Sequence, residues 1–270
     1  MRSLIVNIDD CGCSREADKR IIDYYQSGRV SGISIMPVGD SFLETTKILC
    51  RIDKRETGVH LTLTGRFAPC EADRTAVSSI LDNAEHFLDS YKDFGIRYLF
   101  HRLRLGDVYN EFKAQIQKTL KAGLEITHLD SHEHIHMFPG VFNVVLELAD
   151  EFKVPYIRVP IESSVVLRRG FSFIGVIRYA ALQLFTRYSL RKHRACLSIG
   201  HNDFFWGHFH SERLTEERME FILQHLAPGV NELVLHPVIT DLDILTTPLW
   251  ENVLHTHRIH LLSHKDAMAI

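Results

Sequence analysis

The sequence predicts an α/β fold with mainly parallel strands, closed into a complete or incomplete (β/α) barrel. Two observations favour it. Short apolar, β-branched runs alternate along the chain with helical patterns of about a dozen residues, which is the signature of βαβ units. The chain also has 270 residues, a usual length for such barrels.

The first half of the chain begins with a strand predicted at Leu4–Ile8, an apolar run without alternation, as expected for a buried parallel strand. Ser14–Gln26 then has helical spacing, and Gly28 follows as a stop signal. The next segments are predicted as a strand, a helix, a strand and a loop, in this order: Val30–Pro37, Ser41–Cys50, Thr57–Leu63 and Phe67–Thr75.

The second half contains an amphipathic helix at Asp107–Ala122, for which we expect Asp107 as N-cap and Gly123 as the end. After it we predict a strand, a helix and two further strands, at Ile126–Asp130, Val141–Phe152, Tyr156–Val159 and Leu233–Leu235. The chain shows no internal repeat and no low-complexity linker, so we predict a single domain over residues 1–270.

Composition excludes several classes of protein. With 45% hydrophobic and 24% charged residues, the chain is no collagen, coiled coil or disordered tail. Its five cysteines are odd in number and irregularly spaced, which indicates neither a disulfide framework nor a cysteine zinc site. A net charge of -3 disfavours a nucleic-acid binder. The N-terminus lacks a signal-peptide pattern and no apolar run reaches membrane-spanning length, so we expect a cytoplasmic protein.

Polar residues follow the predicted strands, and in barrels the working residues lie at the carboxyl ends of strands. Asp9 and Asp10 follow the first strand; one could bind a metal while the other takes a proton, or one could simply cap the next helix. His60 lies within the third strand, where a lone histidine is more often a hydrogen-bonded core residue than a ligand.

The segment Thr127–Gly140 holds five potential ligands within nine residues, namely His128, Asp130, His132, His134 and His136. Such density is costly to bury unless the imidazoles are paired or coordinated. If the segment is extended, the last three histidines share one face. We expect one of them to bind a metal while others orient ligands or touch substrate; a solvated loop is the alternative.

Two later strand ends carry His236, before Pro237, and Arg158, before Pro160. His236 suits catalysis or packing, and Arg158 could hold a carboxylate by a bidentate contact or be an ordinary surface arginine. A barrel would bring six such residues to one rim: Asp9, Asp10, His60, His132, Arg158 and His236. One aspartate and two histidines form a sound ligand set for a hydrolytic divalent metal. The residues thus predict metal-assisted hydrolysis.

At these positions the sequence resembles the YdjC-like, or ChbG/HpnK, family of carbohydrate deacetylases. The matching segments are LIVNIDDCG, GVHLTLT, THLDSHEHIHMFPGVF, YIRVP and LHPV, in the family's order. One departure is Cys11, where the family usually has phenylalanine; we expect it to pack beside the site rather than react.

The resemblance implies a β/α barrel and one divalent ion, Mg²⁺ or Zn²⁺, held by Asp10, His60 and His132. It implies that the enzyme removes the acetyl group of an N-acetylated amino sugar. Asp9 would be the base and His236 the general acid, with Arg158 tuning Asp9. A metal-dependent phosphoesterase, or a metal- or carbohydrate-binding protein without turnover, is the alternative; a GxxxxGK[ST] phosphate loop is absent.

The sequence leaves the identity of the substrate open. Residues 165–194 are predicted as a basic amphipathic insertion with six arginines, one lysine and no acid. It could be a core-packed helix with a basic outer face, or a surface that docks on the inner face of a membrane or grips a lipid-linked sugar. The HpnK branch is associated with lipid-bound N-acetylglucosamine and the ChbG branch with chito-oligosaccharides. The oligomeric state, including a homodimer, is open.

Overall fold

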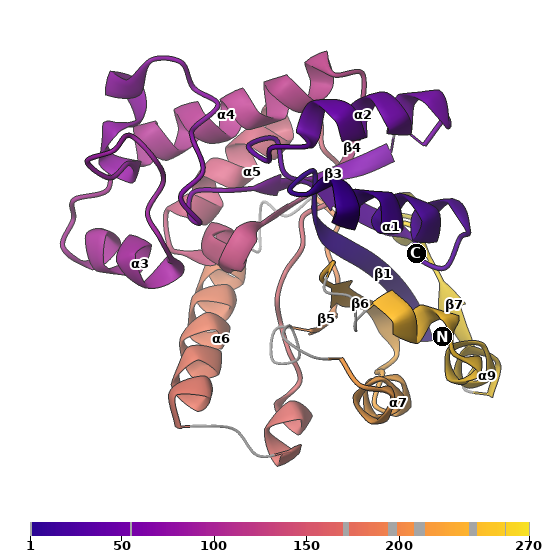
Figure 1. The fold of residues 1–270 in the computed structure, drawn as a ribbon. Helices are drawn as coiled ribbons and strands as arrows, with labels where there is room; N and C mark the ends of the chain where they lie inside the picture. The colour runs from indigo at the N-terminus through magenta and orange to yellow at the C-terminus, as the bar shows by residue number, and fades with distance from the viewer. Residues whose placement is uncertain are drawn as a thin grey trace. The chain divides into compact units, whose positions relative to one another are not determined.

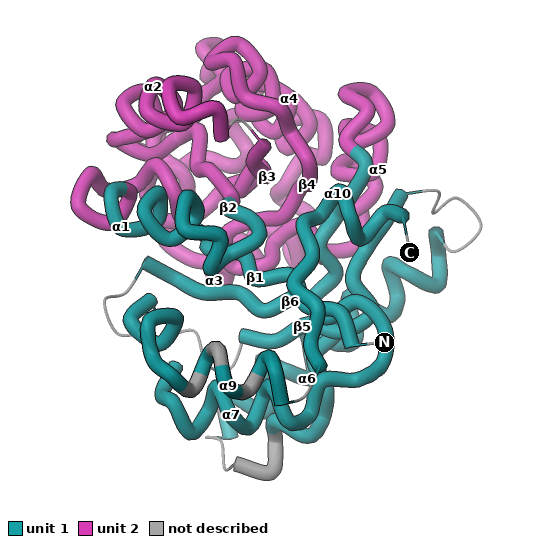
Figure 2. The backbone as a smooth tube through the Cα atoms, turned by 90° about the vertical axis from the view of Figure 1, so that its right-hand side faces the viewer, with its two compact units in different colours: residues 1–9, 19–33, 155–270 teal, residues 10–18, 34–154 magenta. Residues whose placement is uncertain are grey.

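The structure, a computed structural model, describes residues 2–54, 56–169, 173–193, 199–207, 214–237, 242–256 and 258–269 (Figure 1). The chain forms two compact units, coloured separately in Figure 2. Unit 1 comprises Met1–Asp9, Lys19–Ile33 and Pro155–Ile270, and unit 2 comprises Asp10–Asp18 and Ser34–Val154.

The sheet of unit 1 is built on β1 (Arg2–Cys11), whose last two residues belong to unit 2. Strand β1 pairs in parallel with β6 (Gly229–Leu235) and β7 (Ile259–Leu261), and β6 also pairs with β5 (Phe204–Trp206). The helices are most of α1 (Arg15–Gln26), then η3 (Ser164–Arg169), α6 (Phe173–His193), α7 (Glu216–Gln224), η4 (Ile244–Thr246), α9 (Pro248–Thr256) and α10 (His264–Ala267). Here η marks a 3-10 helix.

The core of unit 1 includes a cluster of Ile5, Tyr156 and Val230, against which Leu262 and Ala267 pack. The register of β1 against β6 runs without a shift from Arg2 opposite Gly229 to Ile8 opposite Leu235. The residues that follow Ile8 and Leu235 therefore leave neighbouring strands at the same edge.

In unit 2, β3 (Glu56–Leu61) pairs in parallel with the end of β2 (Gly32–Ile35) and with β4 (Glu125–Ser131). The helices are α2 (Phe42–Arg51), η1 (Arg74–Ile80), α3 (Tyr91–Leu99), α4 (Leu105–Lys121), η2 (His132–Met137) and α5 (Val141–Glu151). Helix α4 packs on α5 and on β3 (Figure 1). Parallel strands and covering helices confirm the predicted α/β class.

Two predicted elements differ from the structure. The helix expected to begin at Asp107 begins at Leu105 instead. Asp107 lies in its first turn, where its carboxylate accepts hydrogen bonds from Arg104 and from the backbone N–H of Ser79. The strand predicted at Tyr156–Val159 is reduced to an isolated bridge between Tyr156 and Gly200.

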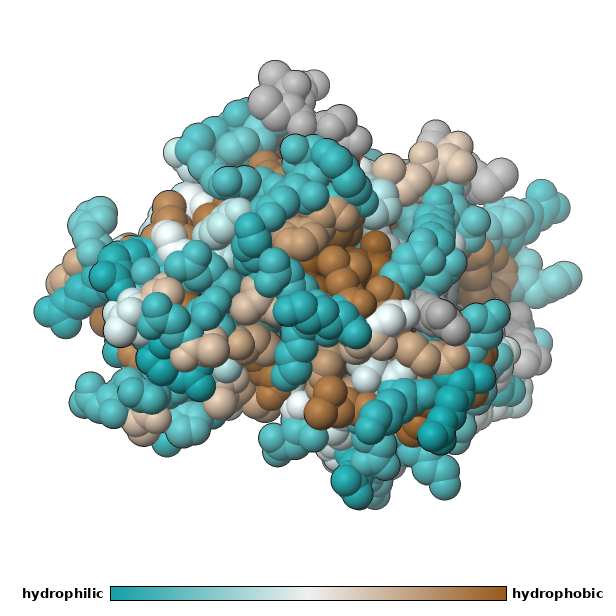
Figure 3. Space-filling model, turned by 90° about the horizontal axis from the view of Figure 1, so that it is seen from above, coloured by the Kyte–Doolittle hydropathy of each residue, from teal (hydrophilic) through white to brown (hydrophobic). Residues whose placement is uncertain are grey.

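None of the described helices combines the length and apolar character that crossing a membrane requires. Hydrophilic side chains, coloured teal, cover most of the surface visible in Figure 3.

Candidate metal centre

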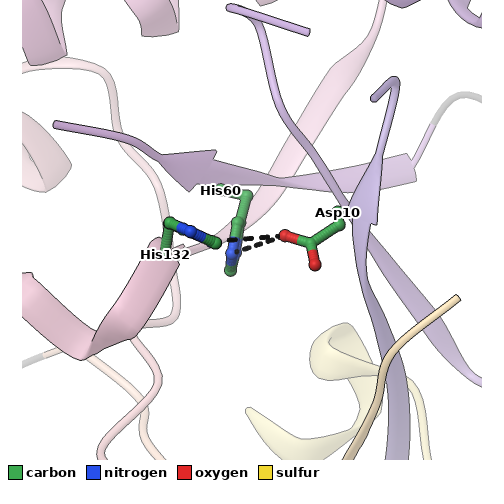
Figure 4. Close-up of side chains that lie close together, drawn as sticks. All are labelled: Asp10, His60 and His132. Atoms are coloured by element: carbon green, nitrogen blue, oxygen red, sulfur yellow. Dashed lines mark ion pairs between the residues drawn. The ribbon is translucent and has the colours of Figure 1, made fainter. Parts of the chain in front are cut away.

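Three predicted ligands from separate elements of unit 2 converge on one point (Figure 4). Asp10 lies near the end of β1, His60 lies in β3, and His132 begins η2 directly after β4. Asp10 Oδ1 lies 3.4 Å from His60 Nε2 and 3.4 Å from His132 Nδ1. One ligand atom of each residue lies within 4.8 Å of the other two. The structure therefore brings these three strand-end positions together.

The spacing of these atoms fits a divalent cation better than direct hydrogen bonding. A charge-assisted N–H···O bond is about 2.7–2.9 Å long, shorter than the 3.4 Å from Asp10 to each imidazole. Two ligands at about 2.0–2.1 Å from a tetrahedral ion lie about 3.4 Å apart. One carboxylate oxygen and two imidazole nitrogens also form a donor set that zinc and similar ions accept. The three residues thus fit a bound divalent cation.

Asp10 has an unusual backbone conformation, with φ of 59° in the left-handed region. Asp is among the few non-glycine residues that tolerate this region. The turn that follows is fixed by buried hydrogen bonds: Gly12 N–H donates to Asp18 Oδ1 at 2.7 Å, and Thr45 donates to Asp18 Oδ2 at 2.6 Å. Strained backbone of this kind is found at functional sites because the surrounding structure holds it.

Asp130 fixes the orientation of His60. Its Oδ1 lies 2.8 Å from His60 Nδ1, and both side chains are buried. Since the carboxylate accepts a hydrogen bond, Nδ1 carries the proton, and Nε2, the nitrogen nearest Asp10, keeps its lone pair for a metal. Ser34 donates to the other Asp130 oxygen at 2.7 Å. Asp130 therefore acts behind a predicted ligand, as carboxylates behind metal-binding histidines do.

A second buried histidine, His128, extends this network. Its Nε2 lies 2.9 Å from Ser34 Oγ and its Nδ1 lies 2.9 Å from Thr127 Oγ1. The ring occupies space that only a glycine leaves open, since a Cβ on Gly58 would lie 2.1 Å from His128 Nε2. Gly58 also adjoins a register shift between β3 and β4. Because Gly58 has no side chain, the His128 ring can pack against β3, the strand that carries His60.

The segment from His132 onward is not extended, so the condition under which His132, His134 and His136 would share one face is not met. Residues 132–137 form η2, in which Glu133 and His134 have left-handed φ values of 54° and 55°. His136 is buried, with Nδ1 2.5 Å from Ser131 Oγ. The kinked turn separates His132 from its neighbours in sequence, and His136 instead stabilises the turn.

In unit 1, the predicted base Asp9 is held by a buried arginine. Arg158 Nη1 donates to Asp9 Oδ2 at 2.7 Å and Arg158 Nη2 donates to Asp9 Oδ1 at 2.8 Å. Asn7 Nδ2 adds a third hydrogen bond at 2.8 Å. Asp9 and Arg158 are buried, where a bidentate pair of this kind gives both strength and orientation. Of the two roles that the sequence left open for Arg158, the structure shows the bidentate contact with a carboxylate and not a surface position.

A second carboxylate, Glu232 of β6, shares the same arginine. Arg158 Nε donates to Glu232 Oε1 at 2.6 Å. Burial raises the pKa of Glu232, but the Arg158 guanidinium and then His264 lower it, so that the pKa ends below its ordinary value. Sequence reasoning missed Glu232. A charge inside the apolar strand NELVL was the available signal, because a buried charge requires a partner.

His236 follows β6 directly and Asp9 precedes the end of β1 by two residues. Because Ile8 pairs with Leu235 in the parallel ladder, Asp9 and His236 are the next residues on adjoining strands. The Nδ1 atom of His236 is buried, and within the described residues it has no hydrogen-bond partner. The register thus supports the prediction that His236 belongs beside Asp9.

Trp206 and Cys11 have structural roles. Trp206 is buried and donates to Asn231 Oδ1 at 3.1 Å. Cys11 is buried; burial, and next the Asp18 carboxylate, raise the pKa of its thiol well above the ordinary value. Its thiol therefore stays protonated, as expected for a packing residue.

Comparisons with known proteins give the family and the fold. Among curated relatives, a carbohydrate deacetylase of Brevibacillus brevis is 28% identical, covering 90% of this chain and 84% of its own. A carbohydrate deacetylase of Thermoanaerobacter pseudethanolicus is 23% identical, covering 99% and 93%. A solved structure of a cellobiose-phosphate cleavage protein from Enterococcus faecalis matches with a TM-score of 0.77 and 23% identity over 98% of both chains, so it shares the fold.

The YdjC-like protein family matches residues 3–263. The match contains all six predicted site residues and spans both compact units; the single domain over residues 1–270 stays a prediction. The resemblance seen in the sequence is confirmed, and the chain belongs to the YdjC-like family.

Proposed function

We propose that the chain is a metal-dependent hydrolase that removes the N-acetyl group from an N-acetylated amino sugar. The observation that carries this proposal is the convergence of Asp10, His60 and His132, with a buried, arginine-bound carboxylate on the residue before Asp10. The names of the curated relatives, carbohydrate deacetylase, support the substrate class.

Asp10, His60 and His132 would hold one divalent cation. Such an ion, when bound, polarises the amide carbonyl and lowers the pKa of a water molecule. The donor set of one carboxylate oxygen and two imidazole nitrogens suits zinc better than magnesium, which prefers oxygen ligands. We therefore propose zinc before magnesium as the resident ion.

Asp9 would act as the general base, taking the proton of the attacking water. Arg158 positions this carboxylate through two hydrogen bonds and supplies the positive charge that favours its ionised form. The Arg158 side chain is itself fixed by Glu232 at 2.6 Å. Asp9 is thereby oriented by residues that do not react.

His236 would act as the general acid and, as imidazolium, protonate the leaving amine of the sugar. Its position one residue beyond the Ile8–Leu235 pair supports this role. The products would be acetate and a free amino sugar. The sugar is a chito-oligosaccharide or a lipid-linked N-acetylglucosamine.

The experiment that tests the proposal combines metal analysis of the purified protein with release assays on N-acetyl sugars, free and lipid-linked. The expected result is about one divalent ion per chain and release of acetate that a chelator stops. Release of phosphate from sugar phosphates without acetate would make the protein a phosphoesterase. A bound metal without turnover of any substrate would make it a binding protein.

A further inference from the structure

Helix α6 of unit 1 buries several polar side chains and exposes several large apolar ones. The face that is buried consists mainly of polar side chains, namely Tyr179, Gln183, Thr186 and Ser189. The face that is exposed carries large apolar side chains, namely Phe173, Val176, Ile177, Leu184 and Tyr188. A surface helix ordinarily buries its apolar stripe, so an exposed stripe of this size marks a binding surface.

The polar face of α6 is fixed to the rest of unit 1 by hydrogen bonds. The hydroxyl of Tyr179 donates to the backbone carbonyl of Glu162 at 3.0 Å, and Gln183 Nε2 donates to the carbonyl of Pro160 at 3.0 Å. These contacts orient the helix, since both buried side chains lie on its inner side. The exposed stripe is therefore a consequence of how the helix is attached.

The exposed residues form one continuous stripe. Phe173, Ile177, Leu184 and Tyr188 follow spacings of four, seven and four residues, which place side chains on the same side of a helix with 3.6 residues per turn. The stripe runs about 22 Å from Phe173 to Tyr188 at 1.5 Å per residue. The exposed fractions of Phe173 and Leu184 are 80% and 65%, so these side chains remain available to a partner.

The charge around the stripe has one sign. No acidic residue occurs in the sequence between Glu162 and Asp203. The helix itself carries Arg178, Arg187, Arg191 and Lys192, all of them exposed. Long basic side chains extend from an apolar stripe toward a polar boundary, and an interfacial helix that binds anionic lipid combines these two features.

We propose that the outer face of α6 docks on an anionic lipid surface, with the Phe173–Tyr188 stripe inserted among the acyl chains and the basic residues on the headgroups. A lipid surface supplies an apolar layer for the exposed stripe and negative charge for the basic side chains around it. A second copy of the chain would instead bring the same cluster of cations, so it is the less complementary occupant. The inference does not depend on the proposed deacetylase activity.

The test measures binding of the full chain to vesicles by sedimentation. Vesicles of phosphatidylcholine alone are compared with vesicles that also contain phosphatidylglycerol, at low and at high sodium chloride. We expect binding to the anionic vesicles only, and a large loss of it at high salt, because exposed charges are screened within about 3 Å at 1 M salt.

Two variants make the test specific to α6. Leu184→Glu should weaken vesicle binding at least about tenfold, since it places a charge in the apolar stripe. The matched control is Leu43→Glu in α2, where the leucine is equally exposed, at 64%; this variant should bind like the wild type. Arg187→Gln combined with Arg191→Gln should weaken binding roughly 25-fold, at about fivefold for each of the two charges.

Acetate release from a soluble N-acetyl sugar should be the same in the wild type and in all these variants, and this assay separates the two proposals. If Leu184→Glu and Leu43→Glu bind vesicles equally, α6 is not the docking surface. If the wild type binds no vesicles and forms a dimer that Leu184→Glu dissociates, the stripe is a protein interface and the lipid proposal is wrong.

Discussion

Carboxylates in the two compact units have opposite kinds of partner. In unit 1, Asp9 and Glu232 share one buried arginine at 2.6–2.8 Å. In unit 2, Asp10 faces two imidazoles at 3.4 Å, and Asp130 is bound by His60 and Ser34. Asp9 and Asp10 are consecutive residues of the same type. Their surroundings, and not their chemistry, are the reason why we propose proton transfer for one and metal binding for the other.

The largest expected effect concerns the proposed metal ligands of unit 2. His132→Ala removes one of three ligands, so we expect loss of the bound metal and a fall in acetate release of at least about 10⁴-fold. Metal content and turnover are measured together on the same preparation. His255→Ala, at an exposed histidine of α9, should change neither. Full metal content in His132→Ala would remove this residue from the site.

Asp9→Asn tests the unit 1 side. The amide keeps the shape of the side chain but cannot take a proton, so turnover should fall by about 10³-fold. Metal content should stay equal to that of the wild type, because Asp9 is not a proposed ligand. An active Asp9→Asn enzyme would show that the base lies elsewhere.

Glu232→Gln tests whether the arginine needs both carboxylates. Removing one charge from a buried pair should lower the free energy of unfolding by about 3 kcal/mol at neutral pH. The folded-state pKa of Glu232 lies below its ordinary value of 4.5, so its stabilisation is present above that pH and is lost as pH falls through the folded pKa. The difference in the free energy of unfolding between the variant and the wild type should therefore become smaller in acid, as measured by denaturant titration from pH 7 to pH 3. A constant gap would contradict the pairing.

Asp130→Asn keeps a side chain of the same size behind His60 but weakens the hydrogen bond that orients it. Metal affinity should fall about 10–100-fold, and excess metal should restore most of the turnover. Asp150→Asn, at an exposed aspartate of α5, is the matched control and should bind metal like the wild type. Unchanged affinity in Asp130→Asn would leave Asp130 with a purely structural role.

The last effect, on stability alone, concerns a buried carboxylate held by neutral donors. Glu111 accepts hydrogen bonds from the backbone N–H groups of Cys70 and Glu71, but burial raises its pKa from 4.5 to about 7. A raised pKa means that the folded state holds a proton that the unfolded state releases, so stability falls between pH 4.5 and 7, by about 1 kcal/mol per pH unit. In Glu111→Gln the free energy of unfolding should no longer fall over this pH range. The stabilisation by Glu232, which grows as pH rises, should remain.

Sequence reasoning predicted the parts of the site that depend on local position. The rule that parallel strands end at a common edge selected Asp9, Asp10 and His236, and the histidine-rich segment drew attention to His132. These signals lie within a few residues of a strand end, so they could be interpreted without knowing which strands pair.

The missed features depend on pairing or on tertiary packing. The partner of Glu232 and the hydrogen bond of Asp130 to His60 depend on residues 74 and 70 positions away in sequence, and no local pattern identifies such partners. The helix expected from residues 165–194 is present in α6, yet its apolar side faces outward. That reversal is set by the hydrogen bonds of Tyr179 and Gln183 with Glu162 and Pro160, which the helical spacing alone does not contain.

The unbroken ladder between β1 and β6 has a consequence for how the chain tolerates change. Deleting one amino acid from the middle of β1 would move the second aspartate into the place of the first, next to the guanidinium, and would leave the imidazoles facing Cys11. Both chemical roles would vanish although every reactive side chain was still encoded. The apolar residues that lock this alignment, none of which meets a substrate, are therefore as sensitive to insertion or loss as the aspartates themselves.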